Sequence, residues 1–210
     1  MSEKRDFDKA AATWDDEPRR VKLAREVAQA VVAAVPLSGD MDVMDFGCGT
    51  GLVTLFLQPS VRSITAVDTS RGMLDVLEAK VHKHGIANVR THLLDAERDA
   101  PPPGRYHLIV SSMTLHHVAD PAPLFRLFRD LLLPGGWLCV ADLDREDGSF
   151  HDDPTGVLHF GFERTSVKGL LTEAGFMEVS DTTAAVIHKS SPVRTGDYPV
   201  FLISCRRPHP

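Results

Sequence analysis

Cysteine is scarce in this chain of 210 residues: Cys48, Cys139 and Cys205 are scattered along it. An odd, widely spaced set is a poor disulfide framework, and its spacing matches no zinc motif. The sequence also lacks a hydrophobic run long enough to cross a bilayer, and its polar start lacks the apolar stretch of a secretory signal. These absences predict free thiols in a cytoplasmic protein that contacts no membrane.

An excess of positive charge is missing as well, since 23 Lys and Arg stand against 29 Asp and Glu for a formal net charge of -6. A mildly acidic surface does not by itself attract nucleic acid, so nucleic acid is not the expected partner. Hydrophobic residues make up 43% of the chain, enough for a sizeable core. We expect a single domain over residues 1–210, and the sequence does not indicate its oligomeric state.

What the sequence does contain is an alternation of strand-like and helix-like hydrophobic patterns. Strands are expected at 41–47, 61–68, 88–94, 106–112, 137–143, 176–188 and 198–207. Helices are expected at 18–35, 52–58, 71–84, 120–133 and 163–174. This alternation predicts an α/β fold with a doubly wound parallel sheet. The last two strands have no helix between them, so we expect an antiparallel hairpin at one sheet edge.

Capping residues mark several of these boundaries. Asp15 or Asp16 can cap the helix that Pro18 opens, and Ser70 and Asp120 precede two later helices. Residues 1–36 then form an N-terminal helical cap, while "PGG" at 134–136 is expected to turn the chain. Residues 144–162 lack periodicity and are rich in His, Asp and Phe. A long loop at the carboxyl end of a strand is typical of a lid, and we expect it to cover a substrate.

The stretch "DFGCGTG" places Gly47, Gly49 and Gly51 between a buried strand and a helix. Glycine at such a turn lets the backbone approach a ligand, and doubly wound sheets bind ligands at this place. The pattern is not the G-x-G-x-x-G of dinucleotide sites, and no Gly-Lys-Ser/Thr of a phosphate loop follows. A pyrophosphate is therefore not the expected ligand, although an NAD-dependent oxidoreductase stays as an alternative.

Acidic residues end the next two strands. Asp68 can accept hydrogen bonds from both hydroxyls of a ribose. Asp95 can accept from the exocyclic amine of adenine, with the Ala96 N–H facing a ring nitrogen, and Met73 can lie against the adenine face. The alternative role for each aspartate is to cap a turn. In this order, these residues favour an adenosine site.

The segments "VMDFGCGTG", "ITAVD", "HLLDAE", "YHLIVSSMTLHHV" and "LLLPGGWLCVAD" resemble class I S-adenosylmethionine-dependent methyltransferases, and most of all the small type 11/12 group. The resemblance runs from about residue 43 to 142. It implies a Rossmann-like sheet of order 3-2-1-4-5-7-6 with strand 7 antiparallel. It also implies S-adenosylmethionine as the cofactor, S-adenosylhomocysteine as the product, and methyl transfer as the activity.

The resemblance assigns a role to most residues of this edge. The three glycines of the turn approach the methionine moiety, Asp45 supports the loop and the cofactor ammonium, Asp68 holds the ribose, and Asp95 and Ala96 frame the adenine. Ser111 faces the methionine end, and Cys48 and Thr69 complete the expected contacts. Trp14 is expected to approach the methionine end, with Phe7 as the second candidate. The alternative for Trp14 is that it only packs the N-terminal extension onto the domain.

The acceptor should lie beyond the fourth and fifth strands. His116 and His151 are the candidate catalytic residues, as general base or substrate hydrogen-bond partners, while a bond to nearby backbone is the structural alternative. His151 with Asp152 and Asp153 matches no metal signature, so no metal is expected.

Two nucleic-acid reactions lack their sequence features. "SSMT" replaces the motif of adenine amino-methyltransferases, and Cys139 looks too buried to be a nucleophile. We therefore expect a small-molecule O, N or C acceptor. A protein or RNA acceptor, and a non-catalytic protein that binds the cofactor without turnover, remain open.

Overall fold

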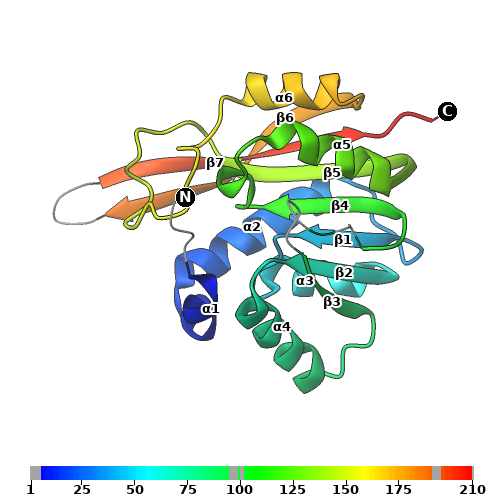
Figure 1. Cartoon of the computed structure of the whole chain (residues 1–210), viewed down its shortest axis with the longest axis horizontal. Coiled ribbons are helices and arrows are strands. Elements are labelled where there is room, and N and C mark those ends of the chain that lie inside the picture. Colours follow the sequence, from blue (N-terminus) through cyan, green and yellow to red (C-terminus); the bar gives the residue numbers. More distant parts are fainter. Residues whose placement is uncertain (1–5, 95–98, 100–101, 191–194, 210) are drawn as a thin grey trace.

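The computed structural model describes residues 6–94, 99, 102–190 and 195–209. Seven strands form one sheet in the order β3-β2-β1-β4-β5-β7-β6 (Figure 1), which confirms the expected order. The strands are β1 Asp42–Phe46, β2 Ser63–Asp68, β3 Val89–Leu93, β4 Tyr106–Ser112, β5 Leu132–Leu143, β6 Met177–Ser190 and β7 Thr195–Arg206. β7 runs antiparallel to both neighbours, while β1 to β5 pair in parallel. The predicted C-terminal hairpin is therefore confirmed.

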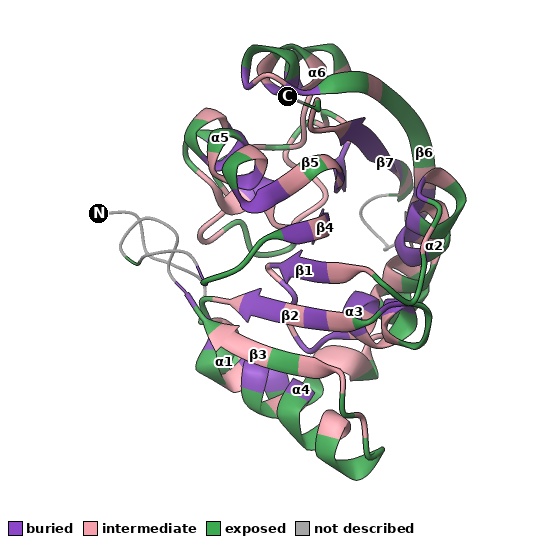
Figure 2. Cartoon of the chain, turned by 90° about the vertical axis from the view of Figure 1, so that its right-hand side faces the viewer, coloured by how far each residue is buried: buried purple, intermediate pink, exposed green. Residues whose placement is uncertain are grey.

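Helices cover both faces of this sheet. They are α1 Phe7–Ala10, α2 Pro18–Ala34, α3 Leu52–Leu57, α4 Arg71–Lys83, α5 Pro121–Leu131 and α6 Arg164–Glu173, with 3-10 turns η1 Ala11–Asp16, η2 Gln58–Ser60 and η3 Leu115–His117. Alternate strand residues point to opposite faces. Met44 and Ile109 therefore belong to the core under α5 and α6, whereas Val43 and Leu108 belong to the core under α2 and α3. Figure 2 shows burial concentrated in the central strands, with β6 largely exposed at its edge.

Two local expectations were wrong. Glu17, not Asp15 or Asp16, caps α2 by accepting from the Arg19 N–H. Residues 134–136 do not end before the strand but lie within β5, which begins at Leu132 directly after α5. The pairing of β5 with β4 shifts register between Tyr106 and Leu108. This irregularity lets glycine-containing backbone stay in the sheet where a turn was expected.

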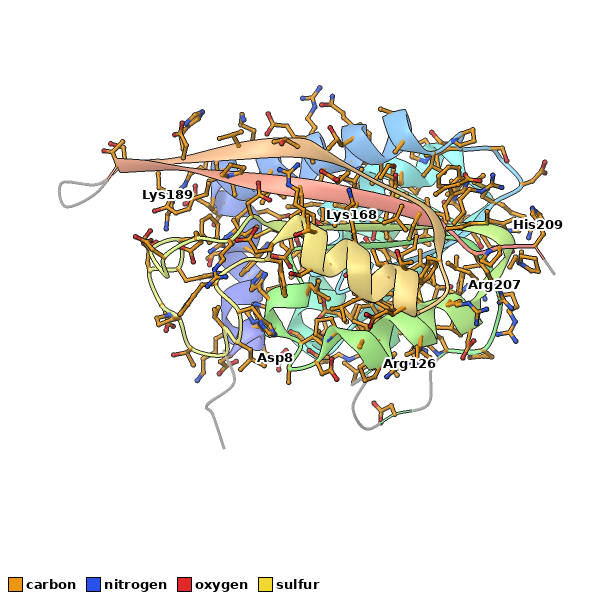
Figure 3. All side chains as sticks on the ribbon, turned by 90° about the horizontal axis from the view of Figure 1, so that it is seen from above. Asp8, Arg126, Lys168, Lys189, Arg207 and His209 are labelled. Atoms are coloured by element: carbon orange, nitrogen blue, oxygen red, sulfur yellow. The ribbon has the colours of Figure 1, made fainter. Side chains whose placement is uncertain are left out.

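The parallel strands bring their carboxyl ends to one edge of the sheet. The N-terminal segment (α1 and η1) lies on that side of the molecule, together with the 144–162 loop (Figure 1). Figure 3 places Lys189, near the hairpin tip, at one end of the molecule and Arg207 and His209 at the other. The residues singled out from the sequence therefore gather at one end, where we build the candidate site. None of the helices in the described part of the chain has both the length and the hydrophobicity of a membrane span.

Candidate functional site

The glycine turn adopts the conformation that requires its glycines. Gly47, Gly49 and Gly51 all have positive φ, at 74°, 54° and 81°. A Cβ at Gly47 would lie 2.1 Å from the Thr114 Oγ1, and one at Gly51 would lie 2.3 Å from a methyl of Leu77. These two glycines are therefore needed for packing within the protein. A Cβ at Gly49 would meet nothing within 4 Å, so only this glycine faces open space.

Asp68 is hydrogen-bonded to the same turn. Its carboxylate accepts from the Gly49 N–H at 2.7 Å and from the Ser70 N–H at 2.9 Å. Burial raises the pKa of this carboxyl above its usual range, and the nearby charge of Asp8 acts in the same direction. Each carboxylate oxygen has two lone pairs, so these bonds leave acceptor capacity for a ligand hydroxyl.

Asp45 lies beneath the turn and is 2% exposed. The Thr54 hydroxyl donates to its carboxylate at 2.5 Å. Burial raises the pKa of Asp45 to about 6, and the charge of Asp68 contributes in the same direction. Two buried carboxyls beside an open glycine make a site that favours a cation over a phosphate.

The raised pKa of Asp45 predicts that a cationic ligand binds more tightly as the pH rises. A pKa of about 6 leaves about a tenth of the carboxyl ionised at pH 5 and nearly all of it ionised at pH 7.5. We expect affinity for S-adenosylmethionine to rise about tenfold over this interval, because only the ionised form attracts the cation. Calorimetric titration at pH 5, 6 and 7.5 measures it.

Asp45→Asn is expected to flatten this pH dependence. Asp42→Asn is the matched control, because Asp42 begins the same strand and the Arg62 guanidinium lowers its pKa to about 2, so that it stays ionised throughout. If Asp45→Asn kept the full wild-type slope, Asp45 would not be the titrating group.

The N-terminal segment is tied to this turn at two points. The Asp8 carboxylate accepts from the Ser70 hydroxyl at 2.5 Å and from the Gly72 N–H at 2.8 Å, at the start of α4. Asp15 accepts from the Thr50 hydroxyl at 2.6 Å and pairs with Lys80 at 2.5 Å. The Lys80 ammonium also donates to the Thr50 carbonyl. The segment is thus held across the edge where Asp68 and the glycine turn lie.

Trp14 is half-buried, with the Arg20 guanidinium 3.9 Å from its ring centroid. Arg20 also donates to the Trp14 carbonyl. The Trp14 ring contacts Phe7 edge-on at 5.9 Å, and Phe7 contacts the His117 ring at 5.3 Å. The structure thus brings both predicted aromatics to the segment beyond β4, while Trp14 itself also packs the N-terminal segment together.

His116 forms the most buried polar pair of the site. It is 3% exposed, and its Nδ1 lies 2.8 Å from a carboxylate oxygen of Asp142, which is fully buried at the end of β5. Burial acts to raise the pKa of Asp142, but the charge and hydrogen bond of His116 hold it below its usual range. His116 and Asp142 come from adjacent strands, so this pairing depends on the β4–β5 register.

Aromatic rings continue from His116 into the 144–162 loop. The His116 ring centroid lies 4.2 Å from that of His117 and 5.1 Å from that of His151. His151 in turn contacts Phe150 at 4.8 Å. The loop is also fixed by backbone bonds, because the Leu158 N–H donates to the His116 carbonyl. The two predicted catalytic histidines are therefore in contact.

The remaining predicted residues differ in their placement. Ser111 and Met73 are buried at the ends of β4 and the start of α4, and Cys48 is buried in the turn, while Thr69 is exposed. Asp95 and Ala96 lie outside the described residues. All three cysteines are free and buried, and burial raises the pKa of the Cys139 thiol to about 12. Within the described ranges, no group of three or more His, Cys, Asp or Glu is arranged to hold a metal ion.

Sequence reasoning missed Asp8 and Thr54, and it considered Asp15 only as a helix cap. Asp8 contacts residues more than sixty positions away, so no local pattern could have identified it. Thr54 has a weak signal, because it stands one helical turn after the glycines and faces the strand they follow.

Comparison with known proteins agrees with this geometry. A family model for the methyltransferase domain matches residues 17–180. An uncharacterized methyltransferase of Schizosaccharomyces pombe is 33% identical over 165 residues, which cover 71% of this chain and 56% of the relative. A ubiquinone biosynthesis O-methyltransferase of Bordetella pertussis is 28% identical over 151 residues, covering 67% of this chain and 60% of the relative. The aligned part of the chain thus spans less than two thirds of either relative.

A solved structure matches nearly the whole fold. In a complex of the Haloferax volcanii Trm112 methyltransferase activator with a methyltransferase, the matching chain gives a TM-score of 0.78. It is 19% identical, and the match covers 98% of this chain and 99% of that one. This likeness shows the fold alone, but the family model covers most of the chain. The sheet order, the glycine turn and the family match together show that the chain belongs to the class I S-adenosylmethionine-dependent methyltransferase family.

Proposed function

We propose that this chain binds S-adenosylmethionine at the glycine turn and transfers its methyl group to a small-molecule acceptor. The observation that carries this proposal is the open space over Gly49, bounded by Asp68 and Asp45. A ligand that reaches this backbone meets carboxylates and no arrangement for phosphate. S-adenosylmethionine fits these residues, because it carries a ribose, an ammonium and a sulfonium but no phosphate.

The residues of this chain would bind and orient the two reactants. Asp68 would accept from the ribose hydroxyls, Asp45 would support the ammonium from below the turn, and Ser111 would face the methionine end. The bound cofactor supplies a methyl carbon on a positively charged sulfur, which a nucleophile displaces in line. Trp14, on the N-terminal segment held by Asp8 and Asp15, would help to exclude water from this edge.

The acceptor would lie between the ends of β4 and β5 and the 144–162 loop, which we propose acts as its lid. His116 and His151 lie there, and aromatic rings line the path between the N-terminal segment and the loop. Such rings suit a small planar acceptor. The Bordetella relative is named for O-methyl transfer in ubiquinone biosynthesis, which supports a small-molecule acceptor here.

Calorimetric titration with S-adenosylmethionine, S-adenosylhomocysteine and NAD tests the cofactor first. We expect binding of the first two and none of NAD. Binding of NAD alone would contradict the proposed function and return the chain to the oxidoreductase alternative. Binding of S-adenosylmethionine with no product formed from any acceptor offered would favour the non-catalytic alternative.

A further inference from the structure

We propose that Asp142 is a positioning residue that orients His116 so that its Nε2 can take a proton from a hydroxyl acceptor. This inference rests on the proposed function and narrows its acceptor class. Asp142 ends β5 and His116 lies in η3 just beyond β4, so the pair stands at the edge where the acceptor is expected. It contributes no bond to the proposed cofactor residues.

The Asp142 carboxylate is surrounded by donors. One oxygen lies 2.8 Å from His116 Nδ1 and accepts from the Leu143 N–H at 2.8 Å, and the other accepts from the His116 N–H at 3.2 Å. An ionised carboxylate can only accept, so the ring nitrogen that faces it must carry a hydrogen. In the neutral imidazole the lone pair then lies on Nε2.

Nε2 is available to a ligand. Among the described residues, the hydrogen bonds of His116 involve only Nδ1 and the backbone groups. Nε2 is also absent from the described buried nitrogen and oxygen atoms that lack a partner, so it retains access to open space. His116 thus presents a lone pair next to the proposed acceptor position while its other nitrogen is fixed from behind.

The neighbouring histidines are held differently. His117 Nδ1 lies 2.7 Å from the Gly156 carbonyl, and His159 Nε2 lies 2.9 Å from the Val118 carbonyl. A carbonyl can fix a ring, but a buried carboxylate also stabilises the charge that the ring gains with a proton. His116 therefore has the surroundings of a base, whereas His117 and His159 have those of structural residues.

A base of this kind favours a hydroxyl over an amine. A neutral amine already has a nucleophilic lone pair, whereas a hydroxyl becomes a strong nucleophile only as its proton leaves. As the acceptor oxygen bonds to the methyl carbon, His116 Nε2 takes the hydroxyl proton. The electrons of the broken carbon–sulfur bond stay on sulfur as a neutral sulfide. Asp142 stabilises the imidazolium, which then releases its proton to water.

Nitrogen NMR of the histidine rings tests the positioning without an acceptor. In the full chain labelled with ¹⁵N-histidine and titrated from pH 6 to 9, neutral His116 is expected to carry its hydrogen on Nδ1, and His116→Gln assigns the signal. A neutral His116 with its hydrogen on Nε2 would overturn the proposal.

Product formation tests the chemistry. Substituted phenols and the matching anilines serve as acceptor probes, and S-adenosylhomocysteine is measured. We expect transfer to phenols, reduced about 100-fold or more in Asp142→Asn, the scale of general-base catalysis, with unchanged cofactor affinity. The matched control is Asp197→Asn, because Asp197 pairs with the exposed His188 on the hairpin. It is expected to keep wild-type rates.

Each other outcome counts against the proposal. Wild-type rates in Asp142→Asn, or transfer to the anilines alone or to neither set, would overturn it. If Asp142→Asn does not fold, His116→Gln gives the same test, because its amide can still donate to Asp142. A wild-type chain that binds no S-adenosylmethionine would defeat the proposed function instead, and the ring tautomer would still be readable.

Discussion

Gly49→Ala is expected to abolish binding of S-adenosylmethionine while the protein stays folded. The new methyl would meet no protein atom within 4 Å, so it would enter the space proposed for the cofactor. We expect at least about a 100-fold loss of affinity, or roughly 2.7 kcal/mol. The positive φ of Gly49 adds a folding cost of about 1 kcal/mol for any other residue. Calorimetry measures the affinity and thermal unfolding measures the stability.

Gly85→Ala is the matched control for this substitution. Gly85 has a φ of 63° and equally open surroundings, but it lies after the end of α4, away from the turn. We expect the same loss of stability and no loss of affinity. Gly47→Ala and Gly51→Ala should instead unfold the turn, because their methyl groups would collide with Thr114 and Leu77. Full cofactor affinity in Gly49→Ala would mean that the ligand does not approach this backbone.

Removal of residues 1–16 is the second change with a large expected effect. α1 has no buried residue, and η1 buries only Ala11, so the deleted segment contributes little to the core. Glu17 remains to cap α2. We expect the shortened protein to fold and to lose about tenfold or more of its affinity for S-adenosylmethionine, because the site edge is opened to water. Calorimetry and circular dichroism measure the two effects.

Point variants separate the two ways in which this segment can act. If Trp14 covers the cofactor, Trp14→Ala should reproduce most of the loss. If the segment acts through its attachment to the turn, Asp15→Ala should do so instead, because it removes the bonds to Thr50 and Lys80. A shortened protein with wild-type affinity would show that the segment takes no part in cofactor binding.

Most of the fold could be predicted because its signals are local. The hydrophobic periodicities identified the helices, and Ser70 and Asp120 cap α4 and α5 as expected. The cap of α2 was wrong because three acidic residues stand in a row, and only the tertiary partners of Asp15 decide which of them is left for the helix. The turn at 134–136 was wrong because strand pairing overrode the preference of Pro-Gly-Gly.

The candidate site could be predicted only where a motif carried it. The glycine turn and Asp68 follow from residues that are close in sequence. The bond between Asp142 and His116, and the attachment of Asp8 to α4, join positions that a pattern cannot relate. For the same reason, the different roles of Gly47 and Gly49 became visible only with their surroundings, since both have positive φ but only one faces open space.

The place of β7 in the sheet determines how one edge of the molecule can open. β7 follows β6 in the chain but lies between β5 and β6, so β6 reaches the sheet only through β7. The hairpin can form locally in microseconds, whereas its docking joins distant positions such as Trp137 and Arg206. β6 and β7 should therefore exchange their amide hydrogens as one cooperative unit whose protection depends on the β5–β7 pairing.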